Sequence, residues 1–370
     1  MKKLAFIGFG LIGASIAKAL KTKCPGEYEI KVYDHHTTPS EALLTAKSDG
    51  MVDAIYSDIE SVLDCDFLFL CAPTLRNIEY LSTIKKLADE KGLTLPFITD
   101  AGSVKGNISE AAKSLGLEKV FLGGHPMAGS EKTGYLNATS HMLENAYYIL
   151  TPSYDFPDDA LTDFEEIVKK TGAIPVILEA DEHDRITAAI SHVPHLVAVE
   201  LVNLVMNAGG DTEKMKLLAA GGFKDITRIA SSSPEMWRSI FLSNKDAVVA
   251  ALEKLEDALV RAEAAIISGD GDYIAKDFKE AGEFRAAIPD TNGMYRKSHR
   301  IFLDVEDEVG IIARIAGILT ESNISIKNIG IVHNRASDPG ALRIDFYAAD
   351  AKDSAAEVLK NSGYTVYLRD

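Results

Sequence analysis

The stretch KKLAFIGFGLIGASIAKALK, residues 2–21, decides the fold of the first part of the chain. A short apolar run is followed by three glycines in the spacing GxGxxG and then by apolar residues at helical spacing, which predicts a strand, a turn and a helix. The first glycine permits a sharp turn, the second lets the backbone approach a pyrophosphate, and the third lets the helix pack on the strand. N–H groups in the first helical turn are free to bind phosphates. The residues predicted to bind a dinucleotide here are Gly8, Gly10, Leu11, Ile12 and Gly13.

A second strand-like segment, YEIKVYD at residues 28–34, gives the glycine turn the context of a βαβ unit. It ends in Asp34, whose carboxylate can accept hydrogen bonds from the adenosine ribose and repel a 2′-phosphate. NAD is therefore the expected cofactor. His35 and His36 follow directly, and partial positive charge there could tolerate the extra phosphate of NADP, so strict selection of NAD stays open.

Four further segments have the composition of buried or half-buried strands: CDFLFLCAP (65–73), LPFITDAGS (95–103), VFLGGHP (120–126) and NAYYILTP (145–152). With helical stretches between most of them, they predict an α/β, Rossmann-type, doubly wound parallel sheet of about six strands or a little more in residues 1–172. Ligands bind beyond the carboxyl ends of such strands. Ala72 and Pro73 lie at one of these ends and join the predicted cofactor site, while Ser103 and His125 lie at two others.

The composition of the chain excludes several classes of partner. Its 39 Lys and Arg residues against 55 Asp and Glu give a net charge of −16, which repels nucleic acid and anionic membranes. No apolar run approaches the roughly 20 residues of a membrane span. Three cysteines without metal-like spacing fit a reducing compartment. We therefore expect a cytoplasmic protein that binds neither nucleic acid nor membrane.

From residue 173 to residue 290 the pattern becomes helical and predicts an all-α domain. The stretch EHDRITAAISHVPHLVAVELVNLVM, residues 182–206, predicts one long helix with Pro194 inside it and with His192 and His195 on one face. The helical segment contains more apolar surface than one sheet can cover, which predicts a homodimer interface. Two histidines without an obvious third ligand do not predict a metal site.

The last part of the chain has its own periodicity. A segment rich in Pro, Asn, Gly and charge at residues 288–299 predicts a linker. Residues 298–370 then read strand, helix, strand, strand, helix and strand, which predicts a third, small α+β domain with βαββαβ order.

The motifs GxGxxG, DxGSVK, GGHPMAGSE, SHxPH and GFxDxTRIAxxxPxMW occur in this order, and together they resemble the prephenate dehydrogenase family. The tail resembles an ACT domain, a module that senses small molecules. The resemblance implies NAD-dependent oxidative decarboxylation of prephenate to 4-hydroxyphenylpyruvate, in tyrosine biosynthesis. Two alternatives stay open: an arogenate (cyclohexadienyl) dehydrogenase, and a non-catalytic regulator that senses NAD or an amino acid.

The resemblance also implies roles for individual residues. His125 would accept the proton of the substrate hydroxyl while Ser103 orients it, and His195 would be the second catalytic histidine. Arg228 would bind the ring carboxylate with its planar guanidinium, although an ion pair with Asp225 is an alternative role. The other residues expected to bind or support the substrate are Ser191, His192, Gly221 and Trp237.

In the tail, the resemblance places an effector at the turn into the first helix and at the start of the second strand. The predicted regulatory residues are Gly310, Ile311, Asn323 and Ile324. Tyrosine, the end product of the pathway, is the expected effector and would act as a feedback inhibitor. The alternative is a module that only dimerises or has lost its ligand.

Overall fold

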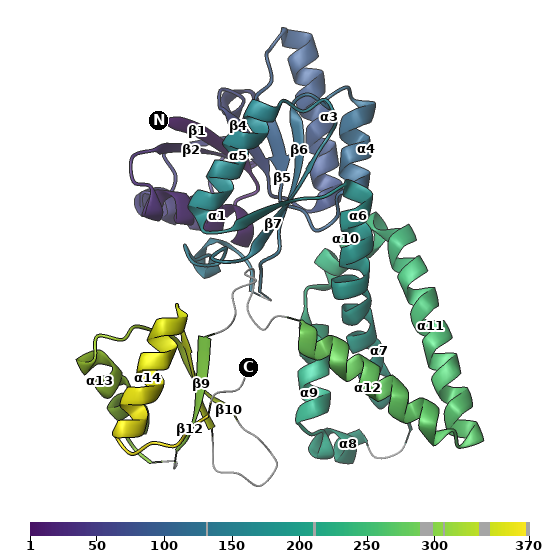
Figure 1. The fold of residues 1–370 in the computed structure, drawn as a ribbon. Coiled ribbons are helices and arrows are strands. Elements are labelled where there is room, and N and C mark those ends of the chain that lie inside the picture. The colour runs from purple at the N-terminus through teal and green to yellow at the C-terminus, as the bar shows by residue number, and fades with distance from the viewer. Residues whose placement is uncertain (131, 210–211, 289–298, 306–307, 333–340, 368–370) are drawn as a thin grey trace. The chain divides into compact units, whose positions relative to one another are not determined.

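The computed structural model describes all residues except 131, 210–211, 289–298, 306–307, 333–340 and 368–370, and it divides into two compact units (Figure 1). The first unit comprises residues 1–293 and the second residues 294–370. The linker predicted at 288–299 lies almost entirely outside the described residues.

The first unit contains one eight-stranded sheet in the order β3-β2-β1-β4-β5-β6-β7-β8. The strands from β1 to β6 are parallel, β7 is antiparallel to β6, and β8 is parallel to β7. Among the described residues between β6 and β7, the connection contains the short 3-10 turn η2 (Tyr135–Asn137) and no α-helix, and the chain returns in the opposite direction. The strands are β1 (Lys2–Ile7), β2 (Tyr28–Tyr33), β3 (Ala54–Tyr56), β4 (Phe67–Leu70), β5 (Phe97–Asp100), β6 (Phe121–Pro126), β7 (Tyr147–Pro152) and β8 (Ile174–Ile177). The predicted Rossmann-type sheet is confirmed, and it extends through residue 177 because β8 joins it beyond the boundary expected at residue 172.

Helices cover both faces of this sheet (Figure 1). Successive residues of β1 alternate between the two faces: Leu4 and Phe6 belong to the core under α1 and α5, and Ala5 and Ile7 to the core under α3 and α4. Each face is therefore sealed from water, as a parallel sheet requires. The helices of this part are α1 (Leu11–Lys23), α2 (Glu41–Ser48), α3 (Thr74–Lys91), α4 (Gly106–Ser114) and α5 (Asp158–Thr171), with short 3-10 turns η1 (Glu60–Val62) and η2 (Tyr135–Asn137).

The helical part follows directly after β8. The predicted long helix is present as α6 (Ala180–Thr187), a π-helical turn η3 (Ala188–His192) and α7 (Val193–Asn207). Pro194 lies in the first turn of α7, directly after the π-helical turn η3. The remaining elements are α8 (Thr212–Leu218), α9 (Gly221–Thr227), the 3-10 turn η4 (Arg228–Ser231), α10 (Pro234–Ser243), α11 (Lys245–Ser268) and α12 (Gly271–Ala287).

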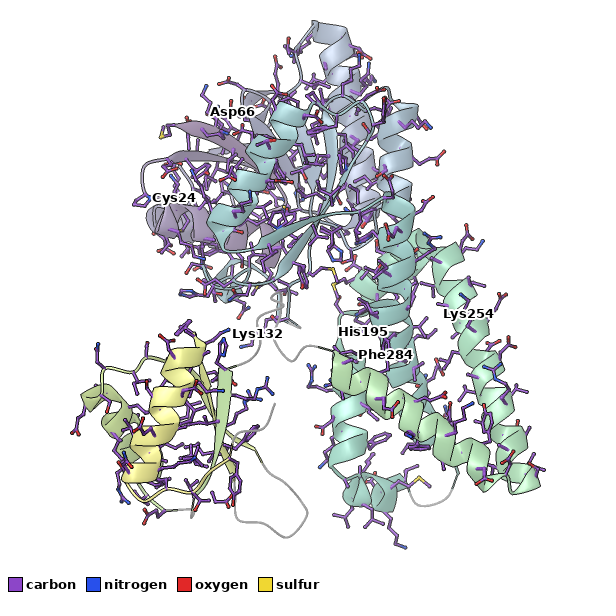
Figure 2. The ribbon with its side chains drawn as sticks, in the orientation of Figure 1. Cys24, Asp66, Lys132, His195, Lys254 and Phe284 are labelled. Carbon is purple, nitrogen blue, oxygen red and sulfur yellow. The ribbon has the colours of Figure 1, made fainter. Side chains whose placement is uncertain are left out.

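Many apolar side chains of these helices face outward within the chain. Leu204 on α7 is 65% exposed and Ile267 on α11 is 79% exposed. Phe284 on α12, which is labelled in Figure 2, is 74% exposed. The run Ala180–Asn207 is by length and composition apolar enough to cross a membrane, although only 17% of its most apolar window is buried. One such helix is weak evidence for a membrane span, since a subunit interface would bury the same side chains.

The second unit is a four-stranded antiparallel sheet in the order β10-β11-β9-β12. Its elements are β9 (His299–Asp304), α13 (Ile311–Glu321), β10 (Ile326–Val332), β11 (Ala341–Phe346), α14 (Ala349–Asn361) and β12 (Val366–Tyr367). Buried residues of both helices and of β9 and β11 share one core, to which Ile301, Ile315 and Leu359 belong. The predicted small α+β domain with βαββαβ order is confirmed.

Candidate active site

The three glycines of the first turn fit a dinucleotide for different structural reasons. Gly8 has a φ of +91°, and a Cβ there would lie 2.7 Å from the carbonyl carbon of Cys71. At Gly13 a Cβ would lie 2.7 Å from the carbonyl oxygen of Gly8, so the helix could not pack as closely. At Gly10 a Cβ would meet no heavy atom within 4 Å. Gly10 thus leaves open space at the start of α1, which has no side-chain cap on its N–H groups.

Asp34 ends β2 in a fixed orientation. Its side chain is buried, and its two carboxylate oxygens accept the backbone N–H groups of His36 (3.1 Å) and Ser40 (3.3 Å). Each oxygen keeps a second lone pair that a ribose hydroxyl could use. His35 and His36 are exposed beside it, and their rings are 3.8 Å apart.

The loop after β4 is shaped by a residue that the sequence did not point to. Asn77 is fully buried, accepts the N–H of Ala72 through Oδ1 (3.1 Å) and donates from Nδ2 to the carbonyl of Leu70 (3.1 Å). Pro73, the residue after Ala72, is the N-cap of α3. The amide of Asn77 therefore determines the path of the chain at the predicted cofactor loop.

His125 lies at the end of β6, half-buried, and its nearest side-chain partner is another histidine. The Nδ1 atom of His125 is 2.8 Å from Nε2 of His183, and Nδ1 of His183 is 2.8 Å from Oδ1 of Asp184. In the part of the chain that the structure describes, Nδ1 of His125 is thus paired with His183, and no hydrogen bond joins it to Ser103, the expected orienting residue.

The carboxylate of Asp184 connects this pair of histidines to the N-terminal end of α4. Its Oδ1 accepts the backbone N–H of Lys105 (2.8 Å) and its Oδ2 accepts that of Gly106 (2.7 Å). A Cβ at Gly106 would lie 2.9 Å from Oδ2, so the close approach needs glycine. The middle of α6 is in this way bound to the start of α4.

A fully buried ion pair contacts the backbone of the residue that precedes His125. The side chains of Lys105 and Asp100 are hydrogen-bonded and have no solvent exposure. Lys105 Nζ also donates to the carbonyl of Gly124 (2.7 Å), and Asp100 Oδ1 accepts the N–H of Gly124 (3.1 Å). The pair therefore fixes the peptide that precedes His125, a role that neither residue was assigned from the sequence.

The two predicted histidines of the helical part, His192 and His195, both contact the indole ring of Trp237. The ring of His195, labelled in Figure 2, stacks on Trp237 at 3.9 Å, while His192 meets the same ring edge-on at 5.9 Å. His195 Nδ1 is 2.9 Å from the carbonyl oxygen of Ser191, and His192 Nδ1 is 3.1 Å from Nδ2 of Asn244. The structure therefore brings four of the predicted residues together.

Three properties of this cluster suit a ligand. The indole N–H of Trp237 is buried and has no hydrogen-bond partner among the described residues. Arg228 is exposed at the start of η4 and forms no ion pair with Asp225 in the described part of the chain, contrary to the alternative role. Gly221 is the first residue of α9. A free guanidinium and a free indole N–H can both donate to an anionic ligand.

Burial keeps these histidines in their neutral forms. It is the main cause that lowers the pKa of His125 well below its usual value, and the nearby His183, Lys105 and His192 add to it. Burial also lowers the pKa of His192 to about 4. The pKa of His195 is lowered by burial and by the positive charge of Arg228, although the contact with Ser191 opposes the shift. At neutral pH His125 can therefore accept a proton.

In the tail, the structure places the four predicted regulatory residues around α13. Gly310, with a φ of +88°, is the N-cap and Ile311 begins the helix. Asn323, with a φ of +56°, and Ile324 line a surface hollow with Thr320 and Ile326, whereas Gly310 and Ile311 do not.

His183, Asp184 and Asn244 were missed because their role depends on partners far away in the sequence. One signal was available in EHDRITA, residues 182–188: a histidine and an aspartate at the start of the predicted apolar helix, with Thr187 and Ala188 one turn later on the same sides. All four residues are buried. Buried ionisable groups require polar partners, but the burial of this side of the helix is visible only in the structure.

A dinucleotide-binding sheet whose edge histidine is paired with a histidine of the helical part defines a dehydrogenase of the nicotinamide-nucleotide class. Comparisons with known proteins narrow this class. Residues 16–177 match the family model "Prephenate dehydrogenase, nucleotide-binding domain", and residues 179–280 match "Prephenate dehydrogenase, dimerization domain".

Individual relatives agree with the family models. The chain is 34% identical to prephenate dehydrogenase of Bacillus subtilis over 98% of this chain and 97% of the relative. It is 35% identical to prephenate dehydrogenase of Lactococcus lactis over 99% of this chain and all of the relative. A crystal structure of prephenate dehydrogenase from Aquifex aeolicus, in complex with hydroxyphenyl propionate and NAD+, matches with a TM-score of 0.68 and 31% identity over 78% of this chain and 99% of that one. The chain belongs to the prephenate dehydrogenase family, and the resemblance found in its sequence is confirmed.

Proposed function

We propose that the chain catalyses the NAD-dependent oxidative decarboxylation of prephenate to 4-hydroxyphenylpyruvate, with CO2 and NADH as the other products. The observation that carries the proposal is the neutral imidazole of His125 at the carboxyl edge of a dinucleotide-binding sheet. Its Nδ1 is already bonded to His183, which leaves Nε2 for a substrate hydroxyl. The uncapped start of α1 and the open space at Gly10 fit the pyrophosphate of NAD.

The chemistry of the substrate matches the residues in the site. When NAD is bound, its nicotinamide accepts the hydride from the carbon that carries the ring hydroxyl. His125 takes the hydroxyl proton as the carbonyl forms. The bond to the ring carboxylate then breaks, CO2 leaves, and its electron pair makes the ring aromatic. The resulting phenolate regains a proton, so the reaction consumes none overall.

The cationic and aromatic residues of the helical part would bind the anionic ends of prephenate. We assign the ring carboxylate to Arg228, because its exposed guanidinium has no ion-pair partner among the described residues, is always charged and is suited to bidentate contacts. Trp237 and His195 form the stacked wall beside it, and the unpaired indole N–H supplies one more donor. Ser191, His192 and Gly221 support this wall or its edge. Ser103, at the end of β5, remains available to the substrate or the nicotinamide.

An assay with purified protein, prephenate and NAD, followed by NADH absorbance, tests the proposal. We expect turnover in the wild type and a loss on the order of 100-fold in kcat for His125→Asn, with KM nearly unchanged, as for loss of a general base. His141→Asn is the control, because His141 is an exposed histidine with a carboxylate partner. Absence of NADH beside a working enzyme would refute the proposal, and arogenate or NADP in the same assay tests the alternatives.

Further proposals concern assembly and regulation. The exposed apolar side chains of α7, α11 and α12 support a homodimer formed through the helical part. The three cysteines are free, which fits a cytoplasmic protein. For the tail we propose an ACT-like regulatory domain that binds tyrosine near Asn323 and Ile324, and that also involves the glycine turn at Gly310 and Ile311. The hollow at the end of α13 supports this assignment.

A further inference from the structure

We propose that His183 and Asp184 are positioning residues that decide which ring nitrogen of His125 carries the proton. The inference rests on the proposed function of His125 as a base and adds the reason why its Nε2 atom is the ring nitrogen without a proton. It assigns a role to two consecutive residues of α6: His183 contacts His125, and Asp184 contacts His183.

The hydrogen bonds of Asp184 determine which ring nitrogen of His183 carries a proton. Its two oxygens accept two backbone N–H groups, from Lys105 at 2.8 Å and Gly106 at 2.7 Å. A carboxylate can only accept hydrogen bonds. The contact of 2.8 Å between Oδ1 and Nδ1 of His183 is then a hydrogen bond donated by the imidazole. His183 therefore carries a proton on Nδ1.

The position of the proton on His183 determines the position of the proton on His125, because the two rings are in contact. A neutral imidazole with a proton on Nδ1 has a lone pair on Nε2. Nε2 of His183 lies 2.8 Å from Nδ1 of His125, so His125 has to be the donor in this contact. The neutral ring of His125 consequently has its proton on Nδ1 and its lone pair on Nε2. A base that accepts a substrate proton needs this tautomer, as the orienting carboxylate of a catalytic triad illustrates.

The groups around His125 and His183 favour the neutral form of His125. From the sheet side Lys105 and Asp100 form their own ion pair, and from η3 the neutral His192 approaches. His183, Lys105 and His192 all disfavour a positive charge on His125. If His183 instead carried both protons, His125 Nδ1 would have to accept, and its Nε2 would present an N–H to the substrate hydroxyl. That arrangement would disable the base.

A matched pair of substitutions separates positioning from packing. His183→Met and His183→Gln have side chains of similar length, but only glutamine has an oxygen that can accept from His125 Nδ1. We expect kcat to fall on the order of 100-fold in the methionine variant with KM changed by less than about threefold. The glutamine variant should recover about tenfold of that loss. Thr187→Val is the control, since Thr187 is buried one turn further along the same helix and bonds only to backbone carbonyls.

Equal kcat values for the methionine and glutamine variants would overturn the proposal, as would a loss confined to KM. A second measurement does not need turnover: 15N NMR of histidine-labelled protein reports the protonated ring nitrogen, with the His125 signals identified by their absence in His125→Asn. The wild type should show the proton on Nδ1 of His125 and His183→Met a mixture of tautomers. A proton on Nε2 in the wild type refutes positioning even if prephenate is consumed. A proton on Nδ1 without any turnover refutes the proposed function and leaves the positioning role intact.

Discussion

Gly124, the residue before the proposed base, shows how little freedom the site has at the scale of single residues. A Cβ at this position would lie 2.6 Å from the carbonyl oxygen of Asp100 and 2.9 Å from Oγ1 of Thr99. Both atoms belong to the neighbouring strand β5, which cannot move without disturbing the sheet. We expect Gly124→Ala to lower the free energy of unfolding by about 1–3 kcal/mol, the usual cost of overpacking.

Chemical denaturation measures this loss, and Gly129→Ala is the matched control. Gly129 lies in the loop that follows β6, is exposed, and would place its Cβ where no heavy atom lies within 4 Å. If both variants lost the same stability, steric confinement at Gly124 would not be the cause.

The role of Arg228 is also a property of one side chain. Because its guanidinium is exposed and has no carboxylate partner among the described residues, its removal should leave the fold intact. We expect Arg228→Gln to raise KM for prephenate by about tenfold or more through the loss of a charge-assisted contact, with a smaller effect on kcat. The KM for NAD is the internal control in the same kinetic series, and a rise in that constant alone would show that Arg228 binds the cofactor instead.

At the residue scale, the sequence predicted the groups that stand out locally and missed those defined by distant partners. His125 among glycines, and His195 with Trp237, come from motifs whose unusual composition points to chemistry. His183 and Asn77 lie in ordinary helical surroundings, and only the packed structure shows that both are buried and hydrogen-bonded. Burial and partner choice depend on tertiary packing, which a local pattern does not contain.

At the scale of elements, the π-helical turn η3 explains how the helical part meets the site. The long apolar pattern predicts one helix, and periodicity alone does not show that its five residues Ala188–His192 widen into a π-helical turn. The turn changes the phase of the helix between His183 and His192. Together with Asn244 on the loop before α11, which donates to the carbonyl of Asp184 at 2.9 Å, it joins α6 to α11.

This element predicts a dependence of stability on pH. Burial lowers the pKa of His192 from 6.5 to about 4, so the folded state resists protonation that the unfolded state accepts. Stability from this group is therefore complete above pH 6.5 and is lost as the pH falls toward about 4. By linkage the loss amounts to roughly 3 kcal/mol.

Unfolding free energies of the wild type and His192→Gln between pH 7 and pH 4 check this slope. The variant starts lower at neutral pH, because it lacks the contacts with Asn244 and Trp237, but its stability should fall less steeply with acidification. Parallel curves for the two proteins would show that His192 does not titrate as proposed.

At the scale of the whole molecule, the order of the three parts was predictable because each has its own hydrophobic period. Alternating strands and helices, a long helical segment, and a renewed βαββαβ pattern follow one another along the chain. The direction of β7 and the place of β8 in the sheet were not predictable in the same way, since a strand's direction depends on how the connection packs.

The separation into two units leads to the last prediction. The tail has a hydrophobic core of its own, which includes Leu303, Leu319 and Ile344, and the sheet and helical parts have separate cores. A chain that ends before residue 298 should therefore still fold and oxidise prephenate. If the tail binds tyrosine, the shortened chain should keep its kcat while inhibition by tyrosine disappears, because coupling between two sites requires both.

Initial rates with increasing tyrosine, measured for the full and the shortened chain, check this prediction, with phenylalanine as the control ligand. Asn323→Ala in the full chain is the finer test: Asn323 lines the hollow near α13, and its φ of +56° is one that alanine rarely adopts. Glycine at the same position accepts this backbone conformation, so Asn323→Gly separates backbone strain from loss of the side-chain amide. Inhibition that survives removal of the tail would place the tyrosine site in the first unit, where the product of the reaction resembles tyrosine and could compete with prephenate directly.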